Sequence, residues 1–335
     1  MRKHFAIMVA VLMTAGTAAL AAAAQPVTLL TKYQMPSDVK GRFDHLGLDL
    51  QGHRLLLTAE SAHEVLVFNL HTGKFIHAIK GIGIPHAILV RGDRICVTDG
   101  GAGEVRIYNA RTYDQIGAVK LKVDSDSIGY DPSTHYLYVD NGGGDAHETY
   151  SMLSVVDTTS RKKVADIKLD GDTLEAMALA NSSPRLYVND PAKNQVDVVD
   201  RKTRALIATW PVTMGKRNVA MALDEAAHRL FVACRSGVLV VFDTRTGKEL
   251  QSLPIARGVD DLIFDPASKL IFAACSAGTL DVYQEESADH YKLVQQVTTA
   301  PGVKNEVFSA ELGRLFMTAP PRGGAPGEVY VYRVK

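Results

Sequence analysis

The sequence predicts an all-β fold, a seven-bladed β-propeller with four strands in each blade. Three observations predict it: a short apolar strand recurs seven times, a second strand follows each copy, and turn-forming residues separate the strands. Self-similarity at a fixed period is the signature of repeat architectures, and several short strands with regular turns indicate a closed all-β fold. We therefore interpret residues 25–335 as one seven-bladed β-propeller domain.

The first recurring strand is rich in β-branched and aromatic residues, as in Leu186-Tyr-Val-Asn. Its copies begin 40 to 49 residues apart, at Leu55, Ile95, Leu137, Leu186, Leu230, Ile271 and Leu315. This spacing is typical of one four-stranded blade, and the composition suits a pleated, mostly buried strand.

The second strand of each repeat commonly ends in Asn or Asp, and two copies continue into Thr72-Gly73 and Thr246-Gly247. Its copies begin at Val65, Val105, Leu153, Val196, Leu239, Leu280 and Val329. Asn and Asp bond to their own backbone in tight turns and Gly supplies positive φ, so these sites indicate hairpins. Each blade is interpreted as strands a, b, c and d, with turns that contain Asp between a and b, as at Asp131-Pro132 and Asp265-Pro266.

The last repeat lacks a fourth strand. It supplies strand a at residues 305–309, b at 315–318 and c at 328–333, after which the sequence stops. Residues 27–35 resemble the fourth strand of the other repeats. We expect this N-terminal strand to complete the last blade and close the ring, because closure removes exposed strand edges.

Residues 1–24 are interpreted as a signal peptide. Arg2 and Lys3 precede an apolar run from Phe5, and Ala22-Ala23-Ala24 precedes Gln25. This order of charged, apolar and small residues is typical of a cleaved secretory signal. An uncleaved membrane anchor is the alternative, but the apolar run is short for a span. We expect a periplasmic or secreted protein with no transmembrane segment after signal cleavage.

The composition restricts which partners and cofactors the protein can bind. The chain has 37 basic and 37 acidic residues, so there is no basic excess to attract a nucleic acid, and we expect no nucleic-acid partner. The three cysteines, Cys96, Cys234 and Cys275, are interpreted as buried and unpaired thiols. There is no Cys-x-x-Cys-His sequence, which excludes an attached c-type haem.

Three copies of strand b, Ile95-Cys-Val-Thr-Asp, Leu137-Tyr-Val-Asp-Asn and Leu186-Tyr-Val-Asn-Asp, resemble the repeat of the YVTN-family β-propellers. The resemblance covers nearly all of residues 25–335 and is specific for the fold. Family members are exported or periplasmic repeat proteins. The resemblance therefore implies an extracytoplasmic binding or scaffold role, and it carries over no catalytic residue.

A candidate site lies where strand a begins, since this strand lines the channel and ligand sites favour channel mouths. Each repeat offers polar residues there: Asp44-His45, His86, Asp126-Ser127, Glu175, Asn218, Asp260-Asp261 and Asn305-Glu306. The predicted ligand-binding residues are His45, His86, Asp126, Glu175, Asn218, Asp261 and Glu306. Imidazole suits zinc and carboxylate suits calcium, so His45, His86, Glu175 and Asp261 are the candidate metal ligands. The alternative is a water-filled channel whose polar residues only satisfy exposed backbone groups.

Two long loops between strands b and c, at residues 141–148 and 320–327, are expected on the same face as the channel mouth. Their candidate binding residues are Asp145, His147, Glu148 and Arg322. Long loops in compact domains are often functional, although loops rich in Gly and Pro are also typical of flexible surface segments.

Two functions remain open. The first, which the residues favour, is an exported, non-catalytic binding or scaffold protein that recognises a small ligand or a protein partner at the channel mouth. The second is a metal-dependent, lactonase-like hydrolase with a divalent ion, calcium or zinc, in the channel. There Asn218 would join the metal ligands, and Asp126 or Glu306 would accept a proton from metal-bound water. The absence of known catalytic motifs and the count of seven blades rather than six favour the first.

Overall fold

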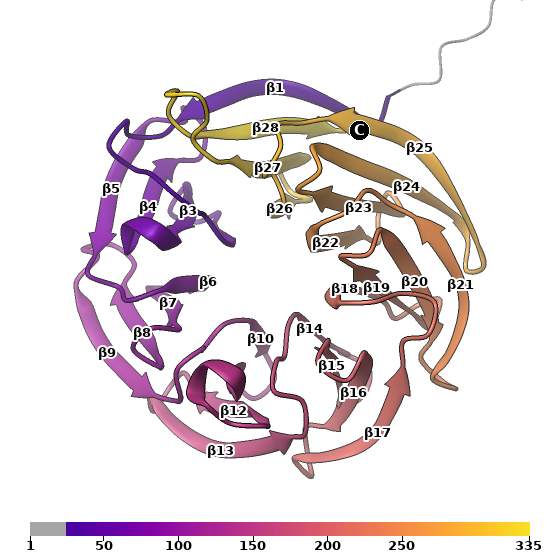
Figure 1. Ribbon diagram of the computed structural model, residues 1–335. Coiled ribbons are helices and arrows are strands. Elements are labelled where there is room, and N and C mark those ends of the chain that lie inside the picture. Colours follow the sequence, from indigo (N-terminus) through magenta and orange to yellow (C-terminus); the bar gives the residue numbers. More distant parts are fainter. Residues whose placement is uncertain (1–24) are drawn as a thin grey trace, which may run out of the picture.

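The computed structural model describes residues 25–335, so the predicted signal peptide lies outside the described residues. The chain forms seven four-stranded antiparallel sheets arranged as the blades of one ring (Figure 1). Each sheet runs from an inner strand a to an outer strand d, with consecutive strands paired. This confirms the predicted all-β, seven-bladed β-propeller.

The first three blades occupy the chain up to residue 169. Blade 1 contains β2 (Leu46–Asp49), β3 (Arg54–Ala59), η1 (Glu60–Ala62), β4 (Glu64–Asn69) and β5 (Phe75–Lys80). Blade 2 contains β6 (Pro85–Arg91), β7 (Arg94–Asp99), β8 (Glu104–Asn109) and β9 (Gln115–Lys120). Blade 3 contains β10 (Ile128–Asp131), β11 (Tyr136–Gly142), η2 (Gly143–Ala146), β12 (Ser151–Asp157) and β13 (Lys162–Leu169).

The next three blades follow in the same order. Blade 4 contains β14 (Met177–Leu179), β15 (Arg185–Asp190), β16 (Gln195–Asp200) and β17 (Ala205–Pro211). Blade 5 contains β18 (Asn218–Asp224), β19 (Arg229–Cys234), β20 (Val238–Asp243) and β21 (Lys248–Pro254). Blade 6 contains β22 (Val259–Asp265), β23 (Leu270–Cys275), β24 (Thr279–Ser287) and β25 (His290–Thr298).

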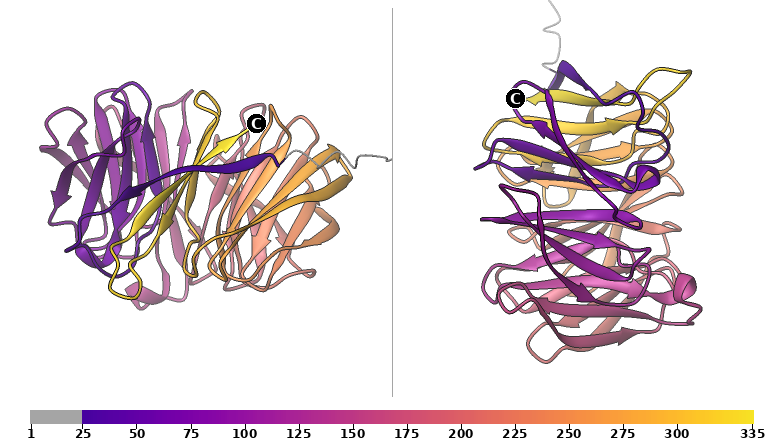
Figure 2. Two further views of the ribbon diagram at one scale, coloured as in Figure 1. Left: turned by 90° about the horizontal axis from the view of Figure 1, so that it is seen from above. Right: turned by 90° about the vertical axis from the view of Figure 1, so that its left-hand side faces the viewer.

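Blade 7 is built from both ends of the described chain. It contains β26 (Glu306–Ser309), β27 (Arg314–Ala319), β28 (Glu328–Val334) and, as its outer strand, β1 (Val27–Gln34). β1 pairs antiparallel with β28, from Val27 opposite Val334 to Gln34 opposite Glu328, and Figure 2 shows the two strands crossing the outside of the ring together. The predicted closure of the ring is confirmed.

The core lies between neighbouring blades. Strands b and c are almost fully buried; Leu55 and Leu57 of blade 1 pack with Phe316 and Val331 of blade 7. Outer strands are more exposed, as Phe75 on β5 shows with 36% of its surface accessible. The three cysteines are buried and unpaired, as predicted. Across residues 25–335, no helix combines the length and the apolar character that crossing a membrane requires.

Candidate functional site

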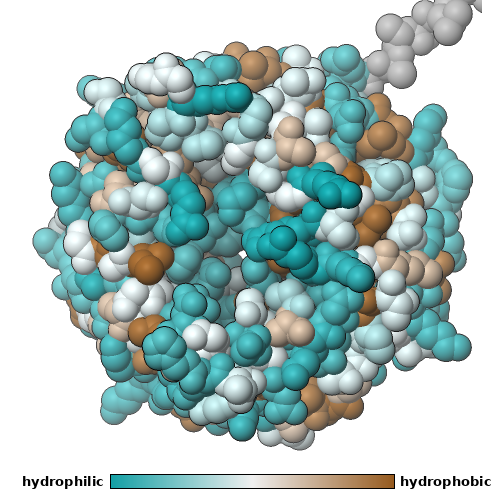
Figure 3. Space-filling view, viewed as in Figure 1, coloured by the Kyte–Doolittle hydropathy of each residue, from teal (hydrophilic) through white to brown (hydrophobic). Residues whose placement is uncertain are grey.

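The inner strands converge on a cavity at one mouth of the channel. It has a volume of about 510 Å³, and Figure 3 shows the centre of the ring hollowed and rimmed by hydrophilic residues. Every blade supplies part of its wall, with these representatives from blade 1 to blade 7: His45, His86, Asp126, Glu175, Val219, Asp260 and Lys304. The predicted channel-mouth position therefore coincides with a cavity.

Irregular strand pairing orients three side chains toward this cavity. β6, β18 and β22 each contain a register shift near their first residue, at Pro85/Ile88, Asn218/Ala220 and Val259/Asp261. A β-bulge of this kind re-aims a side chain and bends the strand. The residues inside the three bulges that line the cavity are His86, Val219 and Asp260.

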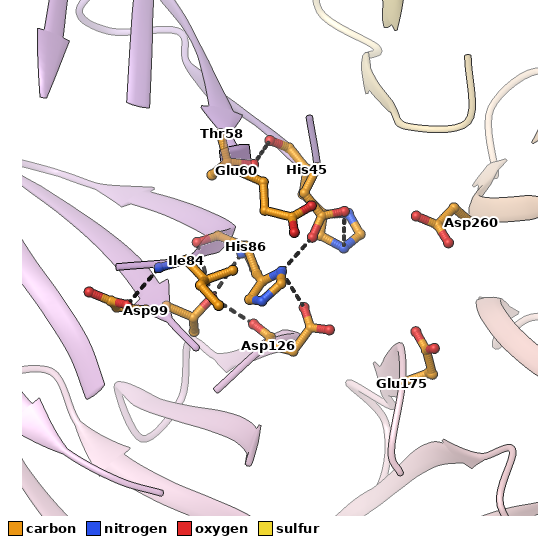
Figure 4. Close-up of polar contacts among 12 residues, drawn as sticks. His45, Thr58, Glu60, Ile84, His86, Asp99, Asp126, Glu175 and Asp260 are labelled. Atoms are coloured by element: carbon orange, nitrogen blue, oxygen red, sulfur yellow. Dashed lines mark hydrogen bonds and ion pairs between the residues drawn. The ribbon is translucent and has the colours of Figure 1, made fainter. Parts of the chain in front are cut away.

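His86 forms a short contact with a carboxylate of the preceding blade. Its Nδ1 atom lies 2.7 Å from Oδ2 of Asp44 and 3.8 Å from Oδ1 of Asp126 (Figure 4). Burial alone would lower the pKa of His86, but the charges of Asp126 and Asp44 outweigh it and raise the pKa to about 9. The ring is therefore an imidazolium at neutral pH.

His45 lies on the other side of Asp44. Its Nδ1 atom is 3.1 Å from Oδ1 of Asp261, and its Nε2 atom is 3.8 Å from Oδ1 of Asp44. Despite burial, the charges of Asp261 and Asp44 raise the pKa of His45 well above its usual value. Burial would raise the pKa of Asp44, but His45 and His86 lower it instead. Asp44 thus lies between two imidazole rings, both of which favour its ionised form.

The opposite wall carries two half-buried cations. Arg235 and Lys304 both donate to the carboxylate of Asp260, and Arg235 also lies 3.5 Å from Oε1 of Glu175. Burial would raise the pKa of Asp260, but Lys304 and Arg235 lower it. Burial raises the pKa of Glu175 to about 8, because Arg235 only partly offsets the loss of solvent.

Blade 3 contributes carboxylates without a strong cationic partner. Asp124 and Asp145 line the cavity, and burial together with the charges of Asp126 and Asp145 raises the pKa of Asp124 to about 6. Oδ1 of Asp126 accepts no hydrogen bond within residues 25–335. Asp140 lies behind these residues, 2% exposed, and burial raises its pKa well above the usual range. Carboxyl groups are therefore concentrated on this wall, and their burial and proximity favour the protonated form of Asp140.

One group of side chains has the spacing of a metal site. Asp44, His45 and Asp126 each offer a donor atom within 4.8 Å of the others. Among the four predicted metal ligands, His45 belongs to this group, and His86 contacts two of its members. Glu175 lies on the opposite wall, as Figure 4 shows. The donor set brought together thus differs from the predicted set, and metal binding stays a prediction.

Three of the predicted channel residues lie beside the cavity rather than in its wall. Asp261 contacts His45 and accepts a hydrogen bond of 2.9 Å from the backbone N–H of Glu306. Glu306 is 5% exposed, and burial raises its pKa well above the usual range. Neither of its carboxyl oxygens has a hydrogen-bond partner in the described part of the chain. Asn218 is buried and donates to the side chain of Asn189 at 2.8 Å.

The two long loops contribute unequally. Asp145 and His147, in and after η2, line the cavity. Glu148 instead forms an ion pair with Lys122 and accepts a hydrogen bond of 2.9 Å from the hydroxyl of Tyr150. Arg322 forms a tight backbone turn with Ala325 and is absent from the cavity wall. The blade 3 loop is therefore the one that shapes the cavity.

Several residues in the wall were missed by sequence reasoning. Asp44 and Asp260 were among the aligned polar residues but not among the predicted ligand-binding residues. Lys304 comes one residue before the aligned position, and Arg235 follows β19 directly, in the short loop of blade 5. A search for charged residues one position earlier, and just after strand b, would have found Lys304 and Arg235.

Comparison with known proteins gives no relative: no protein-family model matches the chain, and no curated protein is significantly similar to it. The seven-bladed β-propeller is established by the structure, and membership of the YVTN family stays a prediction.

Proposed function

We propose that the chain is an exported, non-catalytic binding protein that recognises a small polar ligand in the channel-mouth cavity. The observation that carries this proposal is a cavity of about 510 Å³ to which all seven blades contribute, with a mainly charged wall. Its size falls within the range of about 300 to 1,000 Å³ common for small-molecule sites. Export is supported by the sequence of residues 1–24 and by the family resemblance.

The charges of the wall favour a ligand with a positively charged group. The cationic side chains Arg42, Arg235 and Lys304 are already paired, with Glu60 and Asp260. The carboxylates of Asp124 and Asp145 have no such partner among the described residues. Burial and then the charges of Asp126 and Asp145 raise the pKa of Asp124, and a compact amine placed here would relieve the repulsion between these carboxylates.

Thermal unfolding in the presence of small amines and small carboxylates tests the proposal. We expect amines to raise the melting temperature, because a ligand that binds only the folded state stabilises it. The double variant Asp124→Asn/Asp145→Asn should lose most of this rise. Glu148→Gln is the matched control, since Glu148 lies in the same loop but pairs with Lys122. No response to any amine, or a response to carboxylates alone, would contradict the proposal.

The metal-dependent hydrolase is the second candidate, favoured by the spacing of Asp44, His45 and Asp126. A metal must displace protons from its ligands, and both nearby imidazoles have raised pKa values. Binding of zinc or calcium here should therefore release protons and weaken as the pH falls. Elemental mass spectrometry of the purified protein tests whether it binds a divalent metal ion. About one equivalent of a divalent ion, lost in the His45→Ala/His86→Ala variant, supports this candidate, and no stoichiometric metal excludes it.

A further inference from the structure

Blade 4 carries two buried carboxylates where blade 2 carries an ion pair. In blade 2, Nη2 of Arg106 lies 2.8 Å from Oδ2 of Asp99. The pairing of β15 with β16 places Asp190 and Asp197 at the same register positions as Asp99 and Arg106 in β7 and β8. A cation of one blade is thus replaced by a carboxylate in another.

The two carboxylates of blade 4 face each other. Nε2 of Gln195 lies 2.7 Å from Oδ1 of Asp197 and 3.3 Å from Oδ2 of Asp190, so one amide group contacts both. Asp190 and Asp197 are both 0% exposed. The second oxygen of Asp197, Oδ2, has no hydrogen-bond partner within residues 25–335. A buried polar atom without a partner is costly and calls for an explanation.

A loop that contains two more aspartates passes over Asp190. A Cβ atom built on Gly171 would lie 2.2 Å from Oδ1 of Asp190, so the loop passes directly over that carboxylate. Asp170 and Asp172 flank Gly171. Burial, followed by the charge of Asp190, raises the pKa of Asp197 to about 7, with a further contribution from Asp170. None of the four carboxylates forms a salt bridge in the part of the chain that the structure describes.

Such an arrangement needs a positive charge, because like charges in a buried site repel each other strongly. All of its donors are oxygens, and calcium takes six to eight oxygen ligands, including carboxylates and backbone carbonyls. We propose that Asp190 and Asp197, beside the loop of residues 170–172, bind a calcium ion between blades 3 and 4. None of these residues lines the channel-mouth cavity, so this site is separate from the proposed ligand site.

The site is connected to the rim of the cavity. The backbone carbonyl of Asp172 accepts a hydrogen bond of 2.8 Å from the N–H of Gly144, in η2. The loop that contains η2 also supplies Asp145 and His147 to the cavity wall. A calcium ion that fixes residues 170–172 would therefore also hold this part of the rim in place.

Calorimetric titration with calcium chloride, together with thermal unfolding in calcium or in chelator, tests the proposal. Calcium at about 10 mM should raise the melting temperature by roughly 2 °C or more, and magnesium by less. Asp197→Asn and Asp190→Asn should each abolish the rise. Asp281→Asn is the matched control. It changes the equivalent position of blade 6, where the carboxylate accepts hydrogen bonds from the N–H of Ala256 at 2.6 Å and from Gln296 at 2.7 Å.

The calcium response should persist in Asp281→Asn and in Asp126→Asn, which alters the channel mouth. The proposal fails if calcium produces neither heat nor a thermal shift while Asp197→Asn raises the melting temperature in chelator. That result would mean that the two carboxylates share a proton. It also fails if the shift survives Asp197→Asn, if Asp126→Asn abolishes it, or if magnesium produces an equal shift.

Discussion

The imidazole of His86 lies 2.7 Å from the carboxylate of Asp44 and joins blade 2 to blade 1 at the mouth of the channel. The two residues are 42 positions apart in the sequence. Both line the proposed ligand site, so the contact that fixes the wall of the cavity also sets its charge. Protonation of the ring should therefore affect both stability and binding.

Replacing His86 with Gln should flatten the pH dependence of stability. Because folding raises the pKa of His86 from about 6.5 to about 9, its ion pairs stabilise the protein fully below pH 6.5. That contribution is lost as the pH rises through about 9. We expect His86→Gln to cost about 1 to 3 kcal/mol at pH 6 and little at pH 10, measured by urea unfolding. His290→Gln, which changes an exposed histidine, is the control, and an equal effect of His86→Gln at both pH values would contradict the prediction.

Replacing Glu175 with Gln should stabilise the protein at alkaline pH. Its pKa rises from about 4.5 to about 8 on folding, so the folded state holds a proton that the unfolded state releases between these values. The loss of folding stability that Glu175 causes therefore grows as the pH rises from about 4.5 to 8, and it is constant above pH 8. Glu175→Gln should gain about 1 to 3 kcal/mol at pH 9 and almost nothing at pH 4.5 in urea unfolding. A loss of stability at pH 9 would show that the Arg235 contact outweighs burial.

Lys304 and Arg235 should show strong coupling in a double-mutant cycle, because they share the buried carboxylate of Asp260. Either cation alone keeps Asp260 paired, whereas removal of both leaves a buried charge without a partner. Each single change to Met should cost about 1 kcal/mol, and the double variant at least about 3 kcal/mol. Lys32→Met, which breaks an exposed pair with Glu328, should cost less than about 1 kcal/mol. Additive losses would contradict the coupling.

Phe316 should be essential to the closed ring. Its side chain is 0% exposed and packs against Leu55 and Leu57, which joins the last blade to the first. Phe316→Ala should cost about 3 to 5 kcal/mol in urea unfolding, because it removes contacts and leaves a cavity. Phe75→Ala on the outer strand β5 removes the same side chain from a 36% exposed position and should cost much less. Equal costs would indicate that the blade 7 to blade 1 interface is loosely packed.

The three thiols should be unreactive in the folded protein. Burial raises the pKa of Cys96 to about 11 and that of Cys234 to about 12, and it raises the pKa of Cys275 further from its usual value. Because the thiolate is the reactive species, a thiol reagent at pH 8 should label none of them. The same reagent should label all three in guanidinium chloride. Rapid labelling without denaturant would show that blades 2, 5 or 6 open locally.

Much of the fold could be predicted because each sequence repeat corresponds to one four-stranded blade. The last repeat contains matching strands that begin at Leu315 and Val329, but it has no fourth strand. Residues 27–35 were the segment that could supply it, and β1 pairs with β28 as predicted. The repeat identifies these strands well because every blade needs the same buried strand of β-branched and aromatic residues.

The candidate site was predicted in part. Aligning the repeats identified His45, His86 and Asp126. Both histidines contact Asp44, and Asp126 contacts His86. From the same alignment, Asn218 and Asp261 were chosen as ligand-binding residues, but the bulges at the starts of β18 and β22 place Val219 and Asp260 in the wall. A bulge adds one residue to a strand, and a shift of one residue moves a side chain to the other face.

The sequence by itself determined the number of blades, the strand order and the strand that closes the ring, because these depend on local patterns that repeat seven times. Only the tertiary structure decided which charges meet. Asp44 with His86, Arg235 with Asp260, and Asp190 with Asp197 are pairs whose members lie on different strands or blades. Their contacts depend on register, bulges and the curvature of the ring, and charge interactions change steeply over a few ångströms in a buried site. The chemistry of this protein therefore lies in distances that no repeat in the sequence specifies.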